Sequence, residues 1–225
     1  MTISNDSRTR IKKVFEPIAL GMGRLGLTPD ALTLIGFAIT VVGAVLVSQQ
    51  LWLAGGLVVL LGGVFDMFDG TLARATGKVS NLGAFMDSVF DRAGEAIVYV
   101  GIVVGCAYAG FAEGAIYATA ALGASFMVSY TRAKSEGLGF TSGTGMAAVG
   151  IMPREVRLVI LSLGLIFAPT PIHESVPSGA LCAGPCDFPQ GGALIVALTI
   201  ITAGAIVTTI QRILHVRNQA KQQPT

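Results

Sequence analysis

Long apolar stretches separated by short polar connections run through this chain, and each stretch has the length of a helix that crosses a bilayer. They lie at residues 31–48, 51–71, 84–110, 112–133, 155–170 and 192–214. A transmembrane helix needs about 20 predominantly apolar residues. The pattern therefore predicts an all-α, polytopic membrane protein with six transmembrane helices. An even number of spans places both ends of the chain on one side of the membrane.

The segment before the first apolar stretch alternates between basic and apolar side chains. Residues 8–24 mix arginines and lysines with isoleucine, valine, phenylalanine and leucine, and Pro17 interrupts them. This mixture is typical of an amphipathic helix in the headgroup layer. The helix could anchor the chain or guide a lipid substrate, and both roles stay open. Thr28, Pro29 and Asp30 indicate the cap and first turn of the next helix.

Composition agrees with a membrane protein, because 52% of the residues are hydrophobic and only 12% are charged. We expect an interfacial segment over 1–27, a membrane domain over 28–215 and a cytoplasmic tail over 216–225. No cleavable export signal is expected at the start of this sequence. Glycines inside the predicted spans could let helices approach closely or distort them. They are Gly55, Gly56, Gly62, Gly63, Gly101 and Gly105.

Four aspartates, Asp66, Asp69, Asp87 and Asp91, interrupt the second and third apolar stretches. A carboxylate at membrane depth costs at least about 2.5–3.5 kcal/mol, so this group needs a compensating partner. The spacings i, i+3 and i, i+4 place each pair on one helix face. Two such faces offer the oxygen ligands that Mg²⁺ or Mn²⁺ prefers, which predicts a pair of ions. Helix capping, or ion pairing with Arg74 and Arg92, is the alternative.

Basic residues are distributed unevenly among the connections between the predicted spans. Lysines and arginines occupy the start of the chain, the second and fourth connections and the end of the last span. The connections at Ser48–Gln50, Gly110–Glu113 and Thr170–Gly191 contain neither. Because positive loops stay in the cytoplasm, we expect both termini and the aspartates at the cytoplasmic face of the cell membrane.

The aspartates belong to the longer pattern Asp66-x2-Asp69-Gly70-x2-Ala73-Arg74-x8-Gly83-x3-Asp87-x3-Asp91. Every fixed position and gap matches the signature of the CDP-alcohol phosphotransferase family, and the chain resembles those integral-membrane enzymes. The run Thr28-Pro29-Asp30-Ala31-Leu32-Thr33 and the six-helix plan extend the resemblance. It covers most of the chain and weakens after about Ala168.

The resemblance implies transfer of a phosphatidyl group from a CDP-linked lipid, CDP-diacylglycerol or CDP-archaeol, with release of CMP. It implies that Asp66, Asp69 and Asp87 hold two metal ions, and that Asp91 contacts the second ion and accepts a proton from the attacking hydroxyl. Residues matching those that contact the CDP-lipid in relatives are Pro29, Asp30, Ala31, Leu32, Gly70, Ala73, Arg74 and Ser80. Asp30 replaces an asparagine of many relatives, and Ser80 could equally be a helix cap.

Four cations flank the fourth connection and are candidates for binding the acceptor: Arg132, Lys134, Arg154 and Arg157. Cations near the membrane interface suit a phosphorylated alcohol. This arrangement resembles that of the phosphatidylinositol-phosphate synthases and their archaeal counterparts, which use inositol phosphate. Ordinary positive-inside anchoring is the alternative for these residues. Glycerol 3-phosphate carries the same phosphate, so a phosphatidylglycerol-phosphate synthase stays open.

Two other classes of function are weighed against the enzyme. A cation carrier would spread its acids across the membrane depth, whereas these cluster beside Gly70 and Arg74, and the intact signature disfavours a non-catalytic lipid-binding relative. Relatives imply a homodimer surrounded by membrane lipids, and no nucleic-acid motif is present. Cys106 is predicted to pack in a helix, and Cys182 and Cys186 could form a disulfide in the loop 169–191, whose role is unassigned. The remaining candidates, His173 and His215, are expected to be surface residues.

Overall fold

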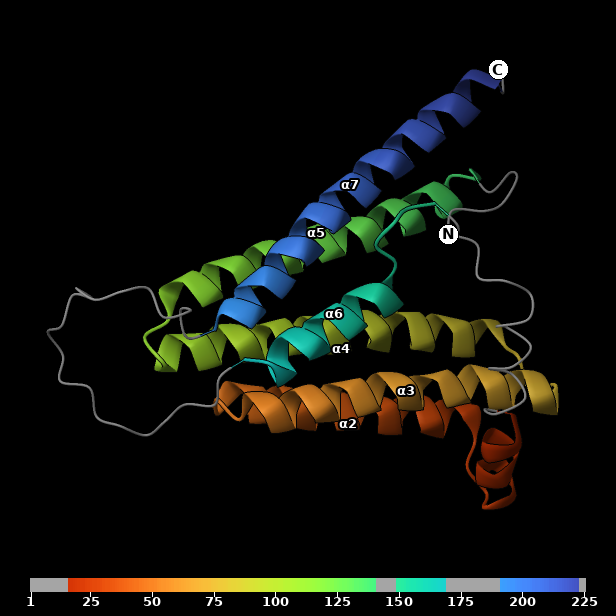
Figure 1. The fold of residues 1–225 in the computed structure, drawn as a ribbon. Coiled ribbons are helices and arrows are strands. Elements are labelled where there is room, and N and C mark those ends of the chain that lie inside the picture. The colour runs from red at the N-terminus through yellow and green to blue at the C-terminus, as the bar shows by residue number, and fades with distance from the viewer. Residues whose placement is uncertain (1–15, 141–148, 169–190, 223–225) are drawn as a thin grey trace, which may run out of the picture.

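The structure is a computed structural model that describes residues 16–140, 149–168 and 191–222. Regular structure in these ranges is helical throughout, without strands. After a short helix over 16–24, the main helices run alternately in opposite directions (Figure 1). They are α2 (Pro29–Ser48), α3 (Trp52–Thr76), α4 (Asn81–Tyr108), α5 (Ala112–Gly137), α6 (Arg154–Ile166) and α7 (Gly192–Gln222). The all-α prediction is confirmed.

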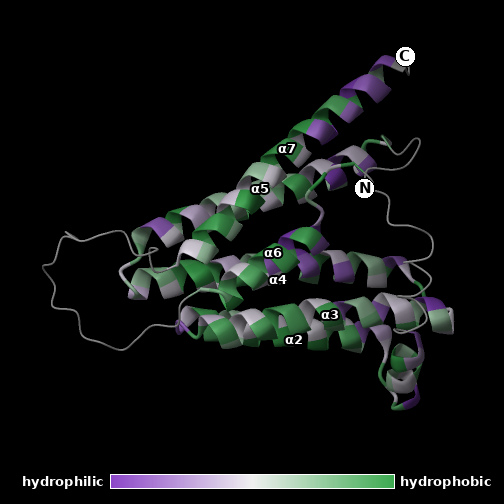
Figure 2. Ribbon diagram, in the orientation of Figure 1, coloured by the Kyte–Doolittle hydropathy of each residue, from purple (hydrophilic) through white to green (hydrophobic). Residues whose placement is uncertain are grey.

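Three helices, α2, α3 and α7, are long and apolar enough to cross a membrane. Figure 2 shows apolar residues along the middle of the bundle and hydrophilic residues gathered towards the helix ends on one side. With 28 and 26 residues, α4 and α5 have sufficient length but carry more charge. Helix α6 has only 13 residues, about 20 Å at 1.5 Å per residue, and is shorter than the predicted stretch 155–170. The count of six spans stays a prediction.

Short polar motifs fix the helix ends near the signature. The Thr28 side chain accepts a hydrogen bond from the Ala31 N–H at 3.2 Å, as predicted for the start of α2. At the start of α4, Ser80 Oγ accepts from the Gly83 N–H at 2.9 Å. Gly77 ends α3 in the left-handed conformation, with φ of 67°. Together these residues set the connection that joins the two aspartate-bearing helices.

Helix α2 packs against both α3 and α4 through positions that lack side chains. A Cβ atom on Gly55 would stand 3.1 Å from the Gly43 carbonyl oxygen, and one on Gly101 only 2.5 Å from the Ala44 carbonyl oxygen. The predicted glycines in the spans therefore do permit close helix approach. Both aspartate-bearing helices, α3 and α4, are therefore packed closely against α2.

The main hydrophobic core lies among α2 to α7, and it includes the fully buried Cys106, as predicted. A smaller cluster of Ala19, Leu32, Phe68 and Leu72 attaches the helix over 16–24 to α2 and α3. That helix lies at a steep angle to α2 (Figure 1). Residues 8–15 of the predicted amphipathic segment lie outside the described residues.

Several sequence predictions fall outside the described residues. They concern Cys182, Cys186, His173 and the loop from 169 to 190. His215 is described, and its Nε2 lies 3.0 Å from the amide nitrogen of Gln219, one turn along α7. This half-buried histidine is thus engaged within its own helix.

Candidate active site

Carboxylates from α3 and α4 converge at one end of the bundle. Oxygen atoms of Asp66, Asp69 and Asp87 all lie within 4.8 Å of one another. Asp69 is 5% exposed, while Asp66 and Asp87 are half-buried. Three clustered carboxylates form an oxygen-only donor set, which suits hard divalent cations such as Mg²⁺ and Mn²⁺. The predicted convergence of the two helix faces is thereby observed for these residues.

Helix α2 contributes Thr33, which ends the run 28–33 of the family resemblance but was not predicted as a site residue. Thr33 Oγ1 lies 2.5 Å from Asp69 Oδ2 and donates to it, and the Gly70 N–H donates to Asp69 Oδ1. Thr33 is buried, so this hydroxyl fixes the orientation of the carboxylate rather than exchanging with solvent. Its place one turn after Pro29, on the same face of α2, was the available signal.

Asp91 lies one turn from Asp87 but is held differently from the other aspartates. Its Oδ1 is 2.5 Å from Arg154 Nη1, and its Oδ2 is 3.0 Å from Arg92 Nη1. The same Arg154 nitrogen lies 2.7 Å from Asp66 Oδ2. Arg154 at the start of α6 therefore joins the first and last aspartates of the signature.

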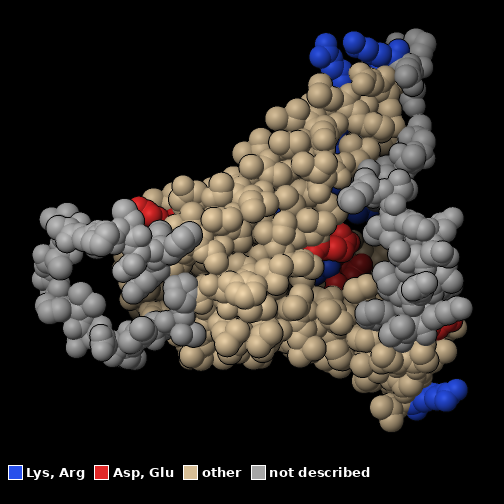
Figure 3. Space-filling model, in the orientation of Figure 1, with Lys and Arg blue, Asp and Glu red and all other residues tan. Residues whose placement is uncertain are grey.

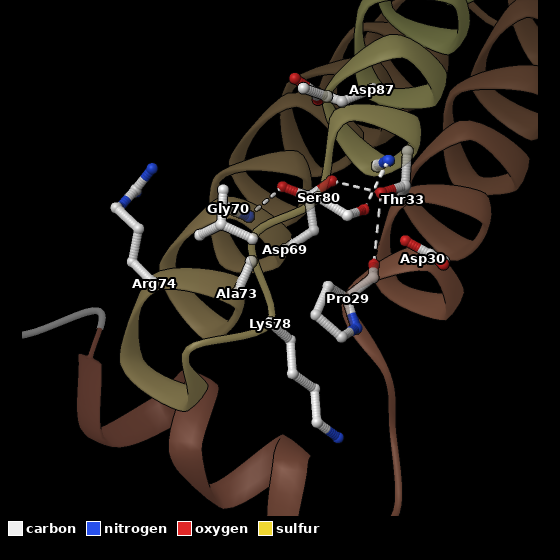
Figure 4. A pocket seen from close by; sticks show the side chains of 13 residues that line it. Pro29, Asp30, Thr33, Asp69, Gly70, Ala73, Arg74, Lys78, Ser80 and Asp87 are labelled. Carbon is white, nitrogen blue, oxygen red and sulfur yellow. Dashed lines mark hydrogen bonds between the residues drawn. The ribbon is translucent and has the colours of Figure 1, made fainter.

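A cavity of about 250 Å³ opens beside the aspartates, between the ends of α2, α3 and α4 (Figure 4). Its lining consists of Pro29, Asp30, Thr33, Asp69, Gly70, Ala73, Arg74, Lys78, Val79, Ser80, Gly83, Ala84 and Asp87. Most of the residues expected to contact a CDP-lipid are among them. Ser80 is both a cavity residue and a helix cap, so the two interpretations of it are compatible.

Two of the expected contacts do not line this cavity. Leu32 is fully buried and packs with Phe68 and Leu72, because the rotation of α2 turns it towards the core. The Ala31 N–H is used to close the helix cap with Thr28. Lys78 does line the cavity, although the sequence did not single it out. Its place in the short connection between the two signature helices was the only signal.

A second cavity, of about 160 Å³, lies on the other side of Asp91 and Arg154. Its lining consists of Asp91, Arg92, Val128, Ser129, Arg132, Pro153, Arg154, Glu155, Arg157 and Arg212. Five of these residues are arginines, contributed by α4, α5, α6 and α7. Figure 3 shows acidic atoms in a hollow on this side of the molecule, with basic atoms beside them.

The second cavity brings together most of the cations proposed for the acceptor. Arg132, Arg154 and Arg157 line it, whereas Lys134 is exposed on α5 and does not. Arg92 and Arg212 were not predicted. Arg212 was detectable, because an arginine within an apolar stretch is a functional candidate in a membrane protein.

The arginines of this cavity differ in how far other groups already engage them. Arg157 pairs with Glu95, and Arg212 donates to the backbone carbonyls of Val149 and Val128. Among the described residues, the Arg132 side chain forms only an exposed pair with Glu136, at 2.9 Å, and such pairs contribute little. Arg132 is therefore the less engaged arginine and can meet an incoming anion, whereas Arg154 already bridges Asp66 and Asp91 and would meet an anion beside them.

Comparisons with known proteins agree with this site. The family model for CDP-alcohol phosphatidyltransferases matches residues 26–214. An archaetidylinositol phosphate synthase of Pyrococcus horikoshii is 36% identical over 160 residues, which is 71% of this chain and 80% of that protein. A phosphatidylinositol phosphate synthase of Streptomyces avermitilis is 30% identical over 218 residues, 96% of this chain and 83% of that protein.

Solved structures show the same fold. The crystal structure of Mycobacterium tuberculosis phosphatidylinositol phosphate synthase with CDP-DAG bound has a TM-score of 0.73 and 29% identity, covering 91% of this chain and 94% of that one. The same enzyme in complex with manganese and citrate has a TM-score of 0.72, at 29% identity, covering 90% of this chain and 88% of that one. This chain therefore belongs to the CDP-alcohol phosphatidyltransferase family, whose members are membrane transferases of phospholipid biosynthesis, and its clustered aspartates are placed to bind a divalent metal ion.

Proposed function

We propose that this enzyme transfers a phosphatidyl group from CDP-diacylglycerol or CDP-archaeol to inositol phosphate and releases CMP. One observation carries the proposal: the aspartates lie between a cavity that suits the CDP-lipid and a separate cavity rich in arginine. The relatives from Pyrococcus and Streptomyces are named for inositol phosphate lipids, and the Mycobacterium enzyme was crystallised with CDP-DAG. Those properties support the choice of both substrates.

On the donor side, the residues bind and orient the diphosphate. Asp66, Asp69, Asp87 and Asp91 would hold two Mg²⁺ or Mn²⁺ ions, which would neutralise the diphosphate and the departing CMP. Gly70 lines the cavity without a side chain, which allows close approach of the nucleotide, and a Cβ there would also crowd Arg74 Nη1 at 3.3 Å. Arg74 and Lys78 supply positive charge around the phosphates.

On the acceptor side, Asp91 is the proposed base. It borders the arginine-rich cavity, where Arg92 and Arg154 fix both of its carboxylate oxygens. The acceptor hydroxyl gives its proton to Asp91 while its oxygen bonds to the phosphatidyl phosphorus. The bond between that phosphorus and the CMP oxygen breaks, and CMP leaves with the electron pair.

The charge of the second cavity favours a phosphorylated acceptor over a neutral alcohol. Five arginines face only the carboxylates of Asp91 and Glu155 in its lining. Arg132 and Arg154 are proposed to bind the acceptor phosphate, since guanidinium groups match phosphate oxygens in bidentate geometry. Arg157 and Arg212 also line this cavity and add positive charge. The acceptor-binding role of Lys134 stays a prediction that no described contact supports.

We further propose that the protein crosses the cell membrane six times, with both termini and the site in the cytoplasm. The site lies at the end of the bundle towards which the basic atoms of Figure 3 gather. Acidic Glu113 lies in the first turn of α5, beside the end of α4 and therefore at the opposite end. This distribution agrees with the positive-inside rule. Residues 28–215 would form the membrane domain, flanked by 1–27 and the tail 216–225, in a homodimer as suggested by the family resemblance.

An acceptor panel tests the proposed reaction. Purified protein, a CDP-lipid and Mg²⁺ are incubated with inositol phosphate, glycerol 3-phosphate, serine or free inositol, and CMP and the lipid product are measured. We expect product with inositol phosphate and little with the others. Preference for glycerol 3-phosphate would make that compound the acceptor in place of inositol phosphate. Absence of metal-dependent CMP release with every alcohol would overturn the proposed function.

A further inference from the structure

A buried ion pair lies behind the arginine-rich cavity. Arg157 Nε and Nη2 each lie 2.8 Å from a carboxylate oxygen of Glu95, which makes the pair bidentate. The two side chains are only 2% and 11% exposed. Glu95 follows Asp91 by one helical turn, and both of its carboxylate oxygens accept from Arg157. The pair joins α6 firmly to α4.

The same arginine also holds the backbone that leads into α6. Arg157 Nη1 donates to the Met152 carbonyl oxygen at 3.1 Å, and the Met152 N–H donates to Thr208 Oγ1 at 3.0 Å. Thr208 lies on α7 and is fully buried. The Met152 carbonyl is therefore fixed by Arg157 of α6, which pairs with Glu95 of α4, and the Met152 N–H is fixed by Thr208 of α7.

Only Pro153 separates this fixed residue from Arg154. Proline has a restricted φ, so the position of Met152 largely determines where α6 begins. Arg154 is the first residue of α6, and its guanidinium contacts both Asp66 and Asp91. A displacement of Met152 would consequently move the group that borders the acceptor cavity.

Arg154 has a second connection to the ion pair. Its buried Nε atom has no hydrogen-bond partner among the described residues. Arg154 and Glu95 both line a small cavity of about 30 Å³, together with Thr40 and apolar side chains.

We infer that Glu95, Arg157 and Thr208 are positioning residues that hold Arg154 where it meets the acceptor phosphate and Asp91. The inference rests on the proposed function, because it assigns Arg154 to the acceptor. A role in stability alone is the competing explanation. Apolar groups can often replace a buried ion pair with little loss of stability. A folded variant without the pair can therefore separate the two explanations, because only the positioning role predicts altered kinetics.

Substitutions at Thr208 separate these explanations. Thr208→Val keeps the shape of the side chain and removes the oxygen that accepts from Met152, whereas Thr208→Ser keeps that oxygen. We expect Thr208→Val to raise the KM for inositol phosphate about ten- to hundredfold, since small displacements near a reacting group have effects of this size. The KM for the CDP-lipid should stay unchanged, and Thr208→Ser should restore the acceptor KM.

The ion pair is tested by a double replacement, because Glu95→Gln alone leaves a buried arginine unpaired and strongly destabilises the fold. The variant Glu95→Leu/Arg157→Met replaces both charges with apolar groups, and thermal unfolding verifies that it folds. It should show a selective rise in acceptor KM, and because Arg157 also lines the acceptor cavity, Thr208→Val is the variant that isolates the positioning role. Tyr99→Phe is the matched control, because it removes a buried hydrogen bond to Ser125 one turn further along α4.

The possible outcomes distinguish the inference from the function on which it rests. If the wild-type enzyme does not consume inositol phosphate, the proposed function fails. If it does, but Thr208→Val and the double variant leave the acceptor KM unchanged, or raise the KM values of both substrates equally, the positioning role is rejected. A selective acceptor effect that Thr208→Ser reverses and Tyr99→Phe lacks supports it.

Discussion

The aspartates of the site contact two different kinds of neighbouring group, neutral hydrogen-bond donors and a guanidinium. Asp69 accepts from neutral donors, Thr33 Oγ1 and the Gly70 N–H, which orient its carboxylate without cancelling its charge. Asp66 and Asp91 instead contact the guanidinium of Arg154. The first arrangement favours binding of a cation by Asp69. The second keeps Asp91 close to the cavity assigned to the acceptor.

Removal of the Thr33 hydroxyl should weaken metal binding. Groups that orient a metal ligand typically contribute about ten- to hundredfold to metal affinity. We expect Thr33→Val to lose affinity in this range, measured as Mn²⁺ binding to the purified protein by electron paramagnetic resonance without substrates. Thr119→Val is the control, because that hydroxyl contacts only a backbone carbonyl on the exposed side of α5. Equal affinities in the two variants would contradict the orienting role.

Substitution of the proposed base should stop turnover while the donor still binds. Asp91→Asn is expected to lower kcat about 10²- to 10⁴-fold, the usual contribution of a positioned base. Binding of the CDP-lipid should be retained, because Asp91 does not line the donor cavity. CMP release and calorimetric binding measure the two effects, with Glu113→Gln at the opposite end of the bundle as control. Normal turnover in Asp91→Asn would remove the base from the mechanism.

At the scale of helices, contacts through glycine decide how closely α4 can approach α2. Gly101 and Gly105 face the carbonyl oxygens of Ala44 and Val47, and a Cβ at either glycine would stand 2.5 Å from the oxygen. Backbone atoms cannot move aside as flexible side chains can. The placement of Asp87 and Asp91 on the same helix therefore depends on glycines far along α4.

Addition of one methyl group to this contact should destabilise the bundle. We expect Gly101→Ala to cost about 1–3 kcal/mol, as overpacking of a well-packed core does. Gly123→Ala on α5 is the matched control, since a Cβ there meets nothing within 4 Å. Thermal unfolding in detergent compares the two variants, and a similar Tm for both would show that α4 shifts without penalty.

The sequence predicted the helices well because hydrophobic patterning acts locally, but it located some ends poorly. The apolar stretch 192–214 ends before helix α7 does, at Gln222, since loss of apolar character marks the expected membrane boundary and not the end of the helix. Contacts across the chain were harder to predict. The Glu95–Arg157 pair spans 62 residues, and the burial of Leu32 depends on how α2 is rotated in the bundle. The spacing of residues along the sequence predicts neither the ion pair nor the burial of Leu32.

At the scale of the whole molecule, charge and chemistry are concentrated at one end. Both cavities and the aspartates lie near the start of α2, α4 and α6, where α3 and α5 end, because successive helices alternate in direction (Figure 1). The N-termini of α2, α4 and α6 and the basic side chains at this end favour anionic substrates, whereas the C-termini of α3 and α5 at the same end oppose them. The opposite end contributes no residue to the lining of either cavity among the described residues.

Thiol labelling tests the proposed orientation in the membrane. Single cysteines at Gln49 and Lys221 are introduced after Cys182 and Cys186 are replaced by serine, while Cys106 is fully buried. An impermeant maleimide should label Gln49→Cys in intact cells, and it should label Lys221→Cys only after permeabilisation. The reverse pattern would invert the orientation and place the site outside the cell.

The separation of the two cavities has a consequence for the order of events during turnover. They share no lining residue, so the two proposed substrates can occupy the enzyme simultaneously. Direct displacement within that ternary complex needs no phosphatidylated enzyme as an intermediate. Double-reciprocal plots at varied concentrations of both substrates should then intersect, and radiolabelled CMP should not exchange into the CDP-lipid when the acceptor is omitted.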